Sequence, residues 1–467
     1  MNGNALKRYG SIPAGETAFP AGTLTICSGF GHQPSFFESG RPLPGCHRPD
    51  AQLTFCVIRL LHAADIHLDT SFSGRDREVR RRLREASREA FRRVVETAVT
   101  EEVDVLVIAG DLFDGSRLSF ETETLLRDSF RRLESAGIPV VYATGNHDPG
   151  QGIARDRLRW PANVTVICDG TPQRIALRSK QEEVIGWLTA AGHHSARETR
   201  DLASAFPHPS GDLPEVAVLH TQVVGSRSEE DHEPYAPSTL TTLTAAGYDY
   251  WALGHVHLRQ SLSDLPAVHY SGNVQGRTHG ETGPKGVLIA EVERHQAARV
   301  RFIPLAPVRW ETLTVRGLEG VASVEQLVGL VRNRWDRIRG QDPDPGTEWM
   351  VRVILEGGCP LWKELREKEE QDALARELTG ALGVLDLLVL ADHVHPVVSV
   401  DDHLDREDVL GFALRLTRRI AAGSGELAEL EAELAAGSPE GGLSNYLAEI
   451  LGDAEGEILS RLRIEDA

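Results

Sequence analysis

Five short clusters of polar residues contain side chains that can bind metal ions. They are Asp65–His67, Gly110–Asp114, Gly145–Asp148, a lone His220 and Gly254–His257. Carboxylate, amide and imidazole groups are the oxygen and nitrogen ligands that suit Mn²⁺, Zn²⁺ or Fe. The clusters contain no cysteine, and together they offer enough ligands for two ions rather than one.

Ligands for two ions predict the hydrolysis of a phosphate ester. Two divalent ions roughly 3.5–4 Å apart polarise the phosphate, lower the pKa of a bridging water, and stabilise the attacking and leaving oxygens. The competing interpretation is that the clusters are polar turn or core residues without a metal. Chance explains one such cluster far more easily than five in this order.

Each cluster comes directly after an apolar run that is typical of a β-strand. These runs are 57–64, 103–109, 138–143, 215–219 and 248–253. In α/β sheets, ligands bind in the crevice at the carboxyl ends of the strands. We therefore expect the five clusters to converge, although nearly 200 residues separate the first from the last. The glycines before three of them suit tight turns at the strand ends.

Strand-like runs and helical segments alternate over residues 57–305. Residues 83–99 place apolar side chains on one helical face and arginine and glutamate on the other. This alternation, followed by more closely spaced strands, predicts a layered α/β domain with a mixed sheet over the whole range.

The pattern changes after this domain. Residues 306–400 are typical of a smaller α+β capping domain, with a helix over Val324–Ile338 and a strand over Trp349–Leu355. Residues 401–467 are predicted to be helical. Residues 1–56 are rich in glycine, proline and serine without strand or helix periodicity, and we expect a disordered leader. One hypothesis is that natural translation begins just after that leader, which N-terminal sequencing of the native protein tests.

Composition restricts the class of protein. The net charge of −19 weighs against tight DNA binding by the chain alone, because affinity for nucleic acid comes largely from phosphate neutralisation. A basic partner subunit could supply the missing charge. The five cysteines are scattered without a CxxC pair, which predicts a reducing compartment and no disulfide framework. The lack of a spanning apolar run and of a secretory signal predicts a cytoplasmic protein without membrane contact.

The order DxH, GDxxD, GNHD, H and GHxH resembles the calcineurin-like metallophosphoesterase superfamily. The resemblance implies a four-layer-like fold, with mixed sheets flanked by helices, and a centre of two divalent ions. One ion would be held by Asp65, His67 and His257. The other would be held by the residues Asn146, His220 and His255.

The same resemblance assigns roles around the ions. Asp111 would bridge them. His147 matches the non-ligand histidine that protonates or stabilises the leaving oxygen, and Asp148 would orient His147 through a hydrogen bond. Asp114 is expected to support its loop. Gly115 stands where protein phosphatases of the superfamily carry an arginine, which disfavours that activity.

Within the superfamily, three strings resemble the SbcD/YhaO-type DNA repair exonucleases. They are Leu61–Asp69, Gly110–Asp114 and the loop Tyr270–Arg277. Asn273 and Arg277 of that loop are expected to bind substrate. The resemblance implies a DNA exonuclease or endonuclease, with Mn²⁺ as the expected ion. A small-molecule or cyclic-nucleotide phosphodiesterase with the same centre remains the alternative.

The resemblance also implies partners. Nucleases of this type bind an SMC-like ABC ATPase of the SbcC or YhaN type through C-terminal helices, and relatives are often dimers. Residues 406–435 contain regularly spaced leucines that could pack on a partner helix or on the chain's own cap.

The remaining histidines receive structural interpretations. His62 is expected to be buried and hydrogen-bonded within the first strand. Gly192–His194 replaces a Ser-Phe or Ser-Tyr pair of the relatives, and both histidines are expected at the surface. His393, His395 and His403 are interpreted as a solvated turn rather than a second metal site.

Overall fold

The structure is a computed structural model that describes residues 56–115, 118–151, 158–226, 235–397, 400–421, 454–456 and 458. The predicted leader, apart from Cys56, and most of the segment after residue 421 lie outside this part of the chain. The structure likewise does not test the hypothesis of a translation start near Val57. The three described cysteines, Cys56, Cys168 and Cys359, are free thiols.

The first of two large sheets carries three of the five polar clusters. Its strand order is β12-β11-β1-β2-β3-β4. The strands β1 to β4 run parallel, whereas β11 and β12 are antiparallel to their neighbours, so the sheet is mixed as predicted. The strand bounds are β1 Val57–Ala63, β2 Val105–Ala109, β3 Val140–Ala143, β4 Val164–Ile167, β11 Gly286–Glu293 and β12 Arg299–Pro304.

The second sheet carries the other two clusters. Its order is β5-β6-β7-β8-β10-β9, with parallel strands from β6 to β10 and antiparallel edge strands. The strand bounds are β5 Gln173–Arg178, β6 Val184–Ala191, β7 Glu215–His220, β8 Tyr250–Gly254, β9 Gln260–Asp264 and β10 Ala267–Tyr270.

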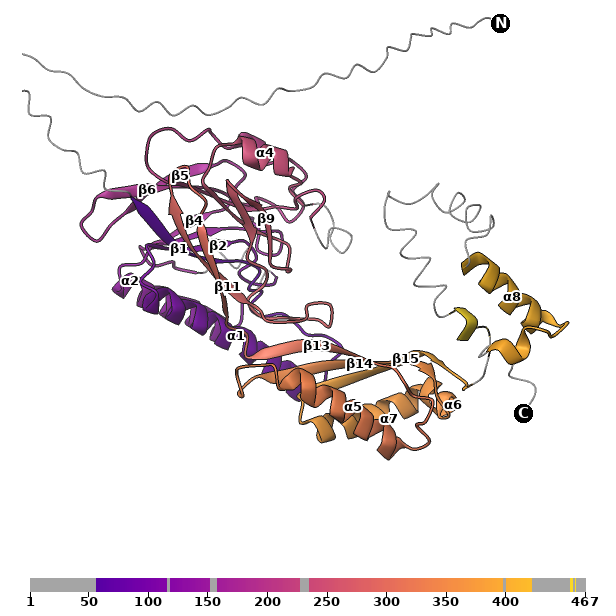
Figure 1. The fold of residues 1–467 in the computed structure, drawn as a ribbon. Helices are drawn as coiled ribbons and strands as arrows, with labels where there is room; N and C mark the ends of the chain where they lie inside the picture. Colours follow the sequence, from indigo (N-terminus) through magenta and orange to yellow (C-terminus); the bar gives the residue numbers. More distant parts are fainter. Residues whose placement is uncertain are drawn as a thin grey trace, which may run out of the picture. The chain divides into compact units, whose positions relative to one another are not determined.

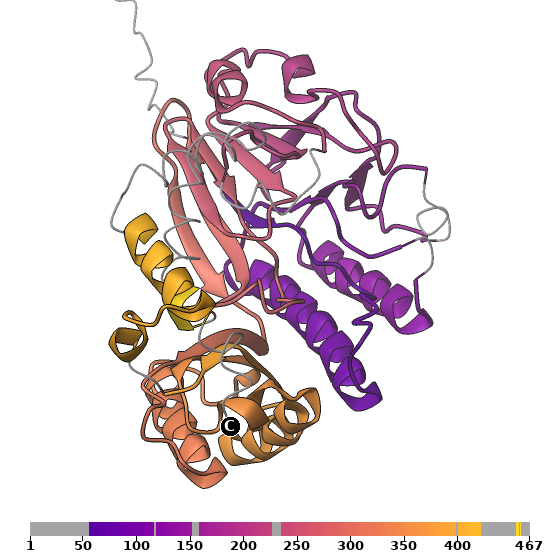
Figure 2. The same cartoon turned by 90° about the vertical axis from the view of Figure 1, so that its right-hand side faces the viewer.

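The two sheets pack face to face, and helices cover their outer faces (Figures 1 and 2). One apolar cluster fills the space between the sheets, with Leu60 and Val107 from the first and Leu188 and Val218 from the second. Helices α1 (Arg77–Thr100) and α2 (Phe120–Ser135) cover the first sheet. The short α4 (Leu240–Ala245) and the 3₁₀ turn η1 (Ala203–Ala205) cover the second. This helix–sheet–sheet–helix arrangement confirms the predicted four-layer-like fold.

A third, three-stranded parallel sheet forms the region predicted to be the cap. Its strands are β13 (Val308–Val315), β14 (Glu348–Gly358) and β15 (Asp386–His395). Helices α5 (Val324–Arg339), α6 (Trp362–Arg366) and α7 (Lys368–Leu382) pack on one face of this sheet. The predicted helix and strand both lie within observed elements, whereas the exact domain limits stay predictions.

The cap sheet contacts helix α1 directly. Trp310 and Met350 pack against Phe72 and Leu83 in a small apolar cluster. Two ion pairs flank it: Arg82 binds Glu348, and Arg75 Nη1 lies 2.7 Å from Asp386 Oδ2. These contacts attach the cap to the segment that begins just after the first polar cluster.

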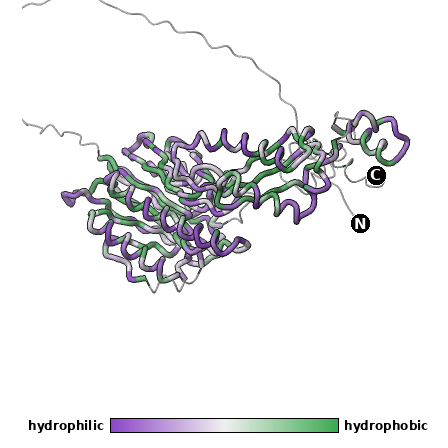
Figure 3. The backbone as a smooth tube through the Cα atoms, turned by 90° about the horizontal axis from the view of Figure 1, so that it is seen from below, coloured by the Kyte–Doolittle hydropathy of each residue, from purple (hydrophilic) through white to green (hydrophobic). Residues whose placement is uncertain are grey.

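The remaining described elements are the 3₁₀ turn η3 (Val400–His403) and the helix α8 (Val409–Ala421). Hydrophobic segments follow the strands in Figure 3, and hydrophilic ones are prominent along helices and loops. None of the helices in the described ranges combines the length and apolar character needed to cross a bilayer.

Candidate metal centre

The carboxyl ends of five strands from both large sheets meet at one place. Asp65 follows β1, Asp111 follows β2, and the 145–148 cluster follows β3. His220 ends β7, and His255 and His257 follow β8. The predicted convergence is therefore observed, and it required two sheets rather than one.

Several of the converging residues have a left-handed backbone. The φ angles of Asp65, His67, Asp111 and His255 are 50°, 49°, 51° and 100°. Non-glycine residues adopt such angles at a cost, and folded proteins retain them mainly at functional sites. The packed strand ends therefore hold these side chains in positions that the isolated chain would disfavour.

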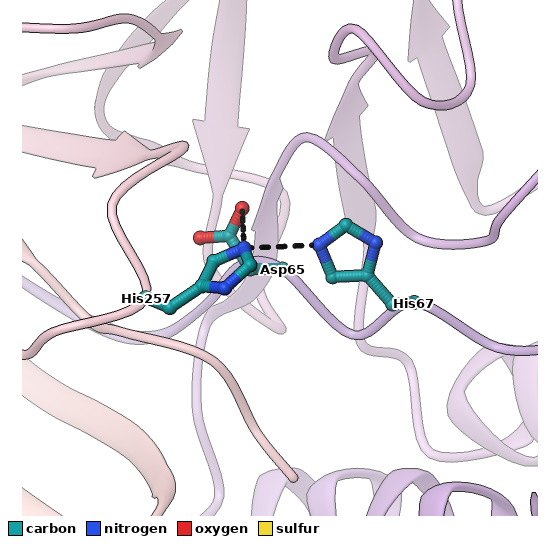
Figure 4. Close-up of side chains that lie close together, drawn as sticks. All are labelled: Asp65, His67 and His257. Carbon is teal, nitrogen blue, oxygen red and sulfur yellow. Dashed lines mark hydrogen bonds and ion pairs between the residues drawn. The ribbon is translucent and has the colours of Figure 1, made fainter. Parts of the chain in front are cut away.

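Asp65, His67 and His257 form the first group of potential ligands (Figure 4). The Nε2 atoms of His67 and His257 lie 3.2 Å apart, and Asp65 Oδ1 lies 3.9 Å from His257 Nε2. Asp65 and His67 are fully buried. Asp65 is also fixed by the backbone N–H of His255, which donates to both carboxylate oxygens at 3.1 Å.

The hydrogen bonds of His67 and His257 indicate which ring nitrogens carry protons, and this pattern suits a bound cation. The Nδ1 of His67 donates to Asp114 at 2.6 Å, and the Nδ1 of His257 donates to Glu281 at 2.8 Å. A carboxylate only accepts, so in the neutral rings both facing Nε2 atoms carry lone pairs. Burial lowers the pKa of both histidines, which disfavours the charged rings. A cation bound between two facing lone pairs would satisfy both of them, and this carboxylate–histidine pattern is the one found behind metal ions.

Asp111 and His220 belong to the second group. The Nδ1 of His220 donates to the Ala109 carbonyl at 2.9 Å, and its Nε2 faces Asn146 Oδ1 at 2.9 Å and Asp111 Oδ2 at 3.4 Å. Asn146 Oδ1 also lies 3.2 Å from His255 Nδ1. Burial opposes the charged form of His220, but the Asp111 carboxylate raises its pKa to about 9. A cation bound here would take the place of that proton.

Asp111 lies between the two groups. Its Oδ2 is 3.7 Å from His67 Nε2 and 3.4 Å from His220 Nε2, and its Oδ1 accepts from the His147 backbone N–H at 2.9 Å. Burial opposes ionisation, but His220 and His67 lower the pKa of Asp111, so it is a carboxylate. This position suits the bridging role that the sequence predicted.

The histidine predicted to act on the leaving oxygen is held by a different aspartate from the one expected. His147 is exposed, and its Nδ1 donates to Asp114 Oδ1 at 2.9 Å. Asp148 is buried and accepts from Leu112 N, Tyr142 Oη and Gly145 N. The contact predicted for Asp148 is thus made by Asp114, because the side chain of Asp148 turns into its own loop.

Asp114 therefore does more than support a loop. Its carboxylate accepts from His67, His147 and Thr70 Oγ1, and Arg277 Nη1 lies 3.4 Å away. Burial opposes ionisation, but these neighbours lower the pKa of Asp114. The sequence feature that points to this role is the GDxxD motif, in which the second aspartate, Asp114, follows Asp111 by three residues.

The loop after β10 supplies a carboxylate to which sequence reasoning gave no role. Glu281 accepts from His257, from Asn273 Nδ2 at 2.7 Å and from Arg277 N at 2.6 Å. Asn273 is buried and donates to Glu281, and its predicted contact with substrate stays a prediction. The Arg277 guanidinium does reach the centre, 3.4 Å from His257 Nε2. No local spacing links Glu281 to His257, which explains why its role was missed.

Three predictions for other histidines can be compared with the structure. His62 is buried and hydrogen-bonded to Tyr250 Oη and Leu253 O, as predicted. His193 is not at the surface: it is buried, and its Nε2 donates to the His220 carbonyl at 2.7 Å. His194 is exposed as expected.

The C-terminal histidines lie outside the groups of potential metal ligands found in the described residues. None of the groups of potential ligands there includes His393, His395 or His403. His403 is buried rather than solvated, because it lies in the turn η3, which contacts α8.

Comparisons with known proteins agree with this geometry. The family model of the calcineurin-like phosphoesterases matches residues 58–259. The chain is 33% identical over 310 residues to an uncharacterized metallophosphoesterase, YhaO, of Bacillus subtilis, covering 65% of this chain and 73% of that one. It is 27% identical over 360 residues to the DNA double-strand break repair protein Mre11 of Methanopyrus kandleri, covering 70% and 74%.

A third relative is the SbcD component of the nuclease SbcCD of Escherichia coli. The identity is 27% over 253 residues, which cover 46% of this chain and 60% of the relative. The residues that the family model matches include all seven predicted metal ligands.

Proposed function

This chain belongs to the calcineurin-like phosphoesterase family, and we propose that it is a DNA nuclease that hydrolyses phosphodiester bonds at a centre of two Mn²⁺ ions. The observation that carries the metal centre is the pair of facing Nε2 lone pairs on His67 and His257, each fixed by a carboxylate on the other side of its ring. The choice of DNA is supported by relatives named as a repair protein and as a component of a nuclease.

The ligands would divide between two ions as the resemblance implies. One group is Asp65, His67 and His257, and the other is Asn146, His220 and His255, with Asp111 shared. Two divalent ions bound there would supply positive charge to a phosphodiester and promote attack by water.

His147 would act on the leaving oxygen. Its hydrogen bond to Asp114 raises the pKa of His147, which favours the imidazolium. The ring is exposed, so its Nε2–H can reach a substrate oxygen, while Asp114 fixes its orientation through Nδ1. Arg277, held between Asp114 and His257, would place a guanidinium beside the phosphate.

One experiment separates this proposal from the alternative of a small-molecule or cyclic-nucleotide phosphodiesterase. The full chain is incubated with Mn²⁺ and either end-labelled single- and double-stranded DNA or bis-p-nitrophenyl phosphate. We expect cleavage of both substrates, with loss on chelation and recovery on adding Mn²⁺ back. Cleavage of the small ester without any degradation of DNA would contradict the nuclease.

Two variants test the roles in the centre. His147→Ala should keep both ions but lower kcat by roughly 10²–10⁴-fold, because it removes general acid catalysis alone. Asp111→Asn should lower the bound content of both ions, because it removes the shared carboxylate. Metal analysis by mass spectrometry gives the readout, and a parent-like metal content in Asp111→Asn would exclude the bridge.

We further propose that an SMC-like ABC ATPase supplies the DNA-binding charge that a chain with a net charge of −19 lacks. Helix α8 offers an apolar contact, since the residues Val409 and Phe412 are 70% and 58% exposed. Phe412→Glu should abolish co-purification with such an ATPase and leave the hydrolysis of bis-p-nitrophenyl phosphate unchanged. A homodimer is also proposed, to be measured by light scattering.

A further inference from the structure

A buried histidine in the loop after β10 has no hydrogen-bond partner among the described residues on either ring nitrogen. His279 is 9% exposed, and both Nδ1 and Nε2 lack a hydrogen bond to any described residue. Its ring lies edge-on to Trp310, with the centroids 4.8 Å apart. A neutral imidazole carries one donor and one acceptor, and buried polar groups in folded proteins are almost always satisfied. Both ring nitrogens of His279 are therefore available to hydrogen-bond a group bound at this position.

Two arginines lie on the same side of the cap sheet as this histidine: the Arg75 guanidinium carbon is 5.4 Å from the centroid of the Trp310 ring, and Arg352 follows Met350 on the face of β14 that packs with Trp310. We name Arg75, His279 and Arg352 the seam cluster. Burial, and then the positive charges of Arg75 and Arg352, lower the pKa of His279 to about 4. Arg75 is paired with Asp386. Arg352 donates from Nε to Thr312 Oγ1 at 3.3 Å, and no described carboxylate forms an ion pair with it. The cluster thus keeps one positive charge that no acidic residue balances.

The cluster lies where the loop after β10 meets the face of the cap sheet opposite its own helices. Val351 and Val353 pack under the cap helices, so Arg352 between them points to the opposite face. The loop is tied to the cap because Trp310 Nε1 donates to the Gly276 carbonyl at 2.8 Å. A Cβ on Gly276 would lie 2.6 Å from the Trp310 ring, so only glycine allows this approach.

One loop connects the seam cluster to the metal centre. Arg277 reaches His257 from one side of the loop, and His279 faces Trp310 from the other. Two residues span at most about 7 Å, so the backbone positions of Arg277 and His279 are no farther apart than that. A DNA strand with one phosphate at the metal ions would reach the seam cluster by running along this loop.

We propose that the seam cluster binds a phosphate of the DNA strand other than the one that is cleaved, an inference that rests on the proposed nuclease function. A phosphodiester carries one negative charge, which matches the unbalanced charge of the cluster. The Arg352 guanidinium would donate its free Nη–H groups to the phosphate oxygens, and the His279 N–H would donate to the same phosphate. The cluster would then select polymeric substrates over single esters.

The test compares Arg352→Gln with a matched control in the full chain. Arg316→Gln removes the same charge from the end of the same cap sheet, about 13 Å beyond Thr312, where Arg316 pairs with Glu356. A fluorescein-labelled single-stranded 12-mer is titrated in a His147→Ala background, and its Kd is measured by anisotropy over a range of salt concentrations. In the active chain, kcat/KM is measured for the 12-mer and for bis-p-nitrophenyl phosphate.

For Arg352→Gln we expect about a tenfold higher Kd and a salt slope smaller by about 1. The ratio of kcat/KM for the 12-mer to that for the small ester should fall by a similar factor. Arg316→Gln should match the parent, and Arg352→Lys should keep the salt slope because it keeps the charge. His279→Phe, which keeps the packing on Trp310 but removes the ring nitrogens, should also raise the Kd.

The outcomes distinguish the two proposals. If the parent cleaves DNA but Arg352→Gln and His279→Phe behave like Arg316→Gln, the second phosphate site is wrong and the nuclease function stands. If the parent cleaves the small ester and neither binds nor cleaves the 12-mer, the nuclease function is wrong and the phosphate site falls with it. Equal melting temperatures of the variants and the parent establish that each variant is folded.

Discussion

At the residue scale, one carboxylate accepts hydrogen bonds from two histidines that have different proposed roles. Asp114 accepts from His67, a proposed metal ligand, and from His147, which would act on the leaving oxygen. Both donors use Nδ1, so the same aspartate fixes the orientation of each ring, with the lone pair of the neutral His67 and the N–H of the charged His147 both on Nε2. Metal binding and proton transfer would therefore be coupled through a single side chain.

The division of labour between Asp114 and Asp148 can be tested with a matched pair of variants. Asp114→Asn should lower kcat by roughly 10–100-fold, because it disturbs the orientation of both histidines. Asp148→Asn should instead lower the free energy of unfolding by about 1.5–3 kcal/mol, because its carboxylate accepts two backbone N–H groups and the Tyr142 hydroxyl. Urea unfolding and steady-state kinetics are measured for both variants. A loss of stability in Asp114→Asn together with a loss of kcat in Asp148→Asn would contradict this assignment.

At the element scale, the centre depends on how closely the ends of strands from different sheets approach. A Cβ on Gly254, at the end of β8, would lie 1.8 Å from the carbonyl oxygen of Ala109, at the end of β2. Glycine is therefore required where the two sheets bring their ligands together.

This requirement predicts a specific loss of stability. Gly254→Ala should lower the free energy of unfolding by about 1–3 kcal/mol, because the methyl group meets backbone that cannot rotate away. The control is Gly329→Ala within helix α5, where a Cβ meets no atom within 4 Å. That substitution should be neutral or stabilising by up to about 1 kcal/mol. Equal effects of the two substitutions in urea unfolding would contradict the account.

The first strand also predicts a dependence of stability on pH. Burial lowers the pKa of His62 to about 3, below the ordinary value of 6.5 in the unfolded chain. The unfolded state then binds more protons between these values, so stability falls as the pH decreases from about 6.5. For His62→Gln in the presence of chelator, the free energy of unfolding should depend less on pH, by about 1 kcal/mol per pH unit between pH 6 and 5. Parallel pH profiles for His62→Gln and the parent would show that another group dominates.

At the scale of the whole molecule, a buried group of carboxylates and histidines makes folding and metal binding interdependent. Asp65, Asp111 and His220 are buried at the junction of the two sheets, so the folded chain holds the site ready while the unfolded chain disperses it. The cap is tied to the same region through Trp310 and the loop after β10.

Metal removal should therefore lower the melting temperature. A ligand at 100 times its Kd stabilises the folded state by about 2.7 kcal/mol, which corresponds to a shift of several degrees. Scanning calorimetry of the chelated chain, before and after adding Mn²⁺, measures this shift. Asp111→Asn should show a smaller response, and a parent-like response in that variant would mean that Asp111 does not bind the ions.

The sequence by itself determined the ligand types, their order, and their positions at strand ends. This was possible because a strand end is a local feature, which an apolar run followed by glycine and aspartate or histidine makes visible. It also determined the layered α/β class, because alternating strands and helices must cover their apolar faces in layers.

The tertiary structure decided which side chains meet. That Asp114 rather than Asp148 contacts His147, that Glu281 fixes His257, and that His193 is buried under His220 depend on distances across elements far apart in sequence. Those contacts are set by rotamers and by the packing of two sheets, to which no local periodicity is sensitive. The polar clusters were therefore predictable as a set, whereas the hydrogen bonds that give each of their members a role were not.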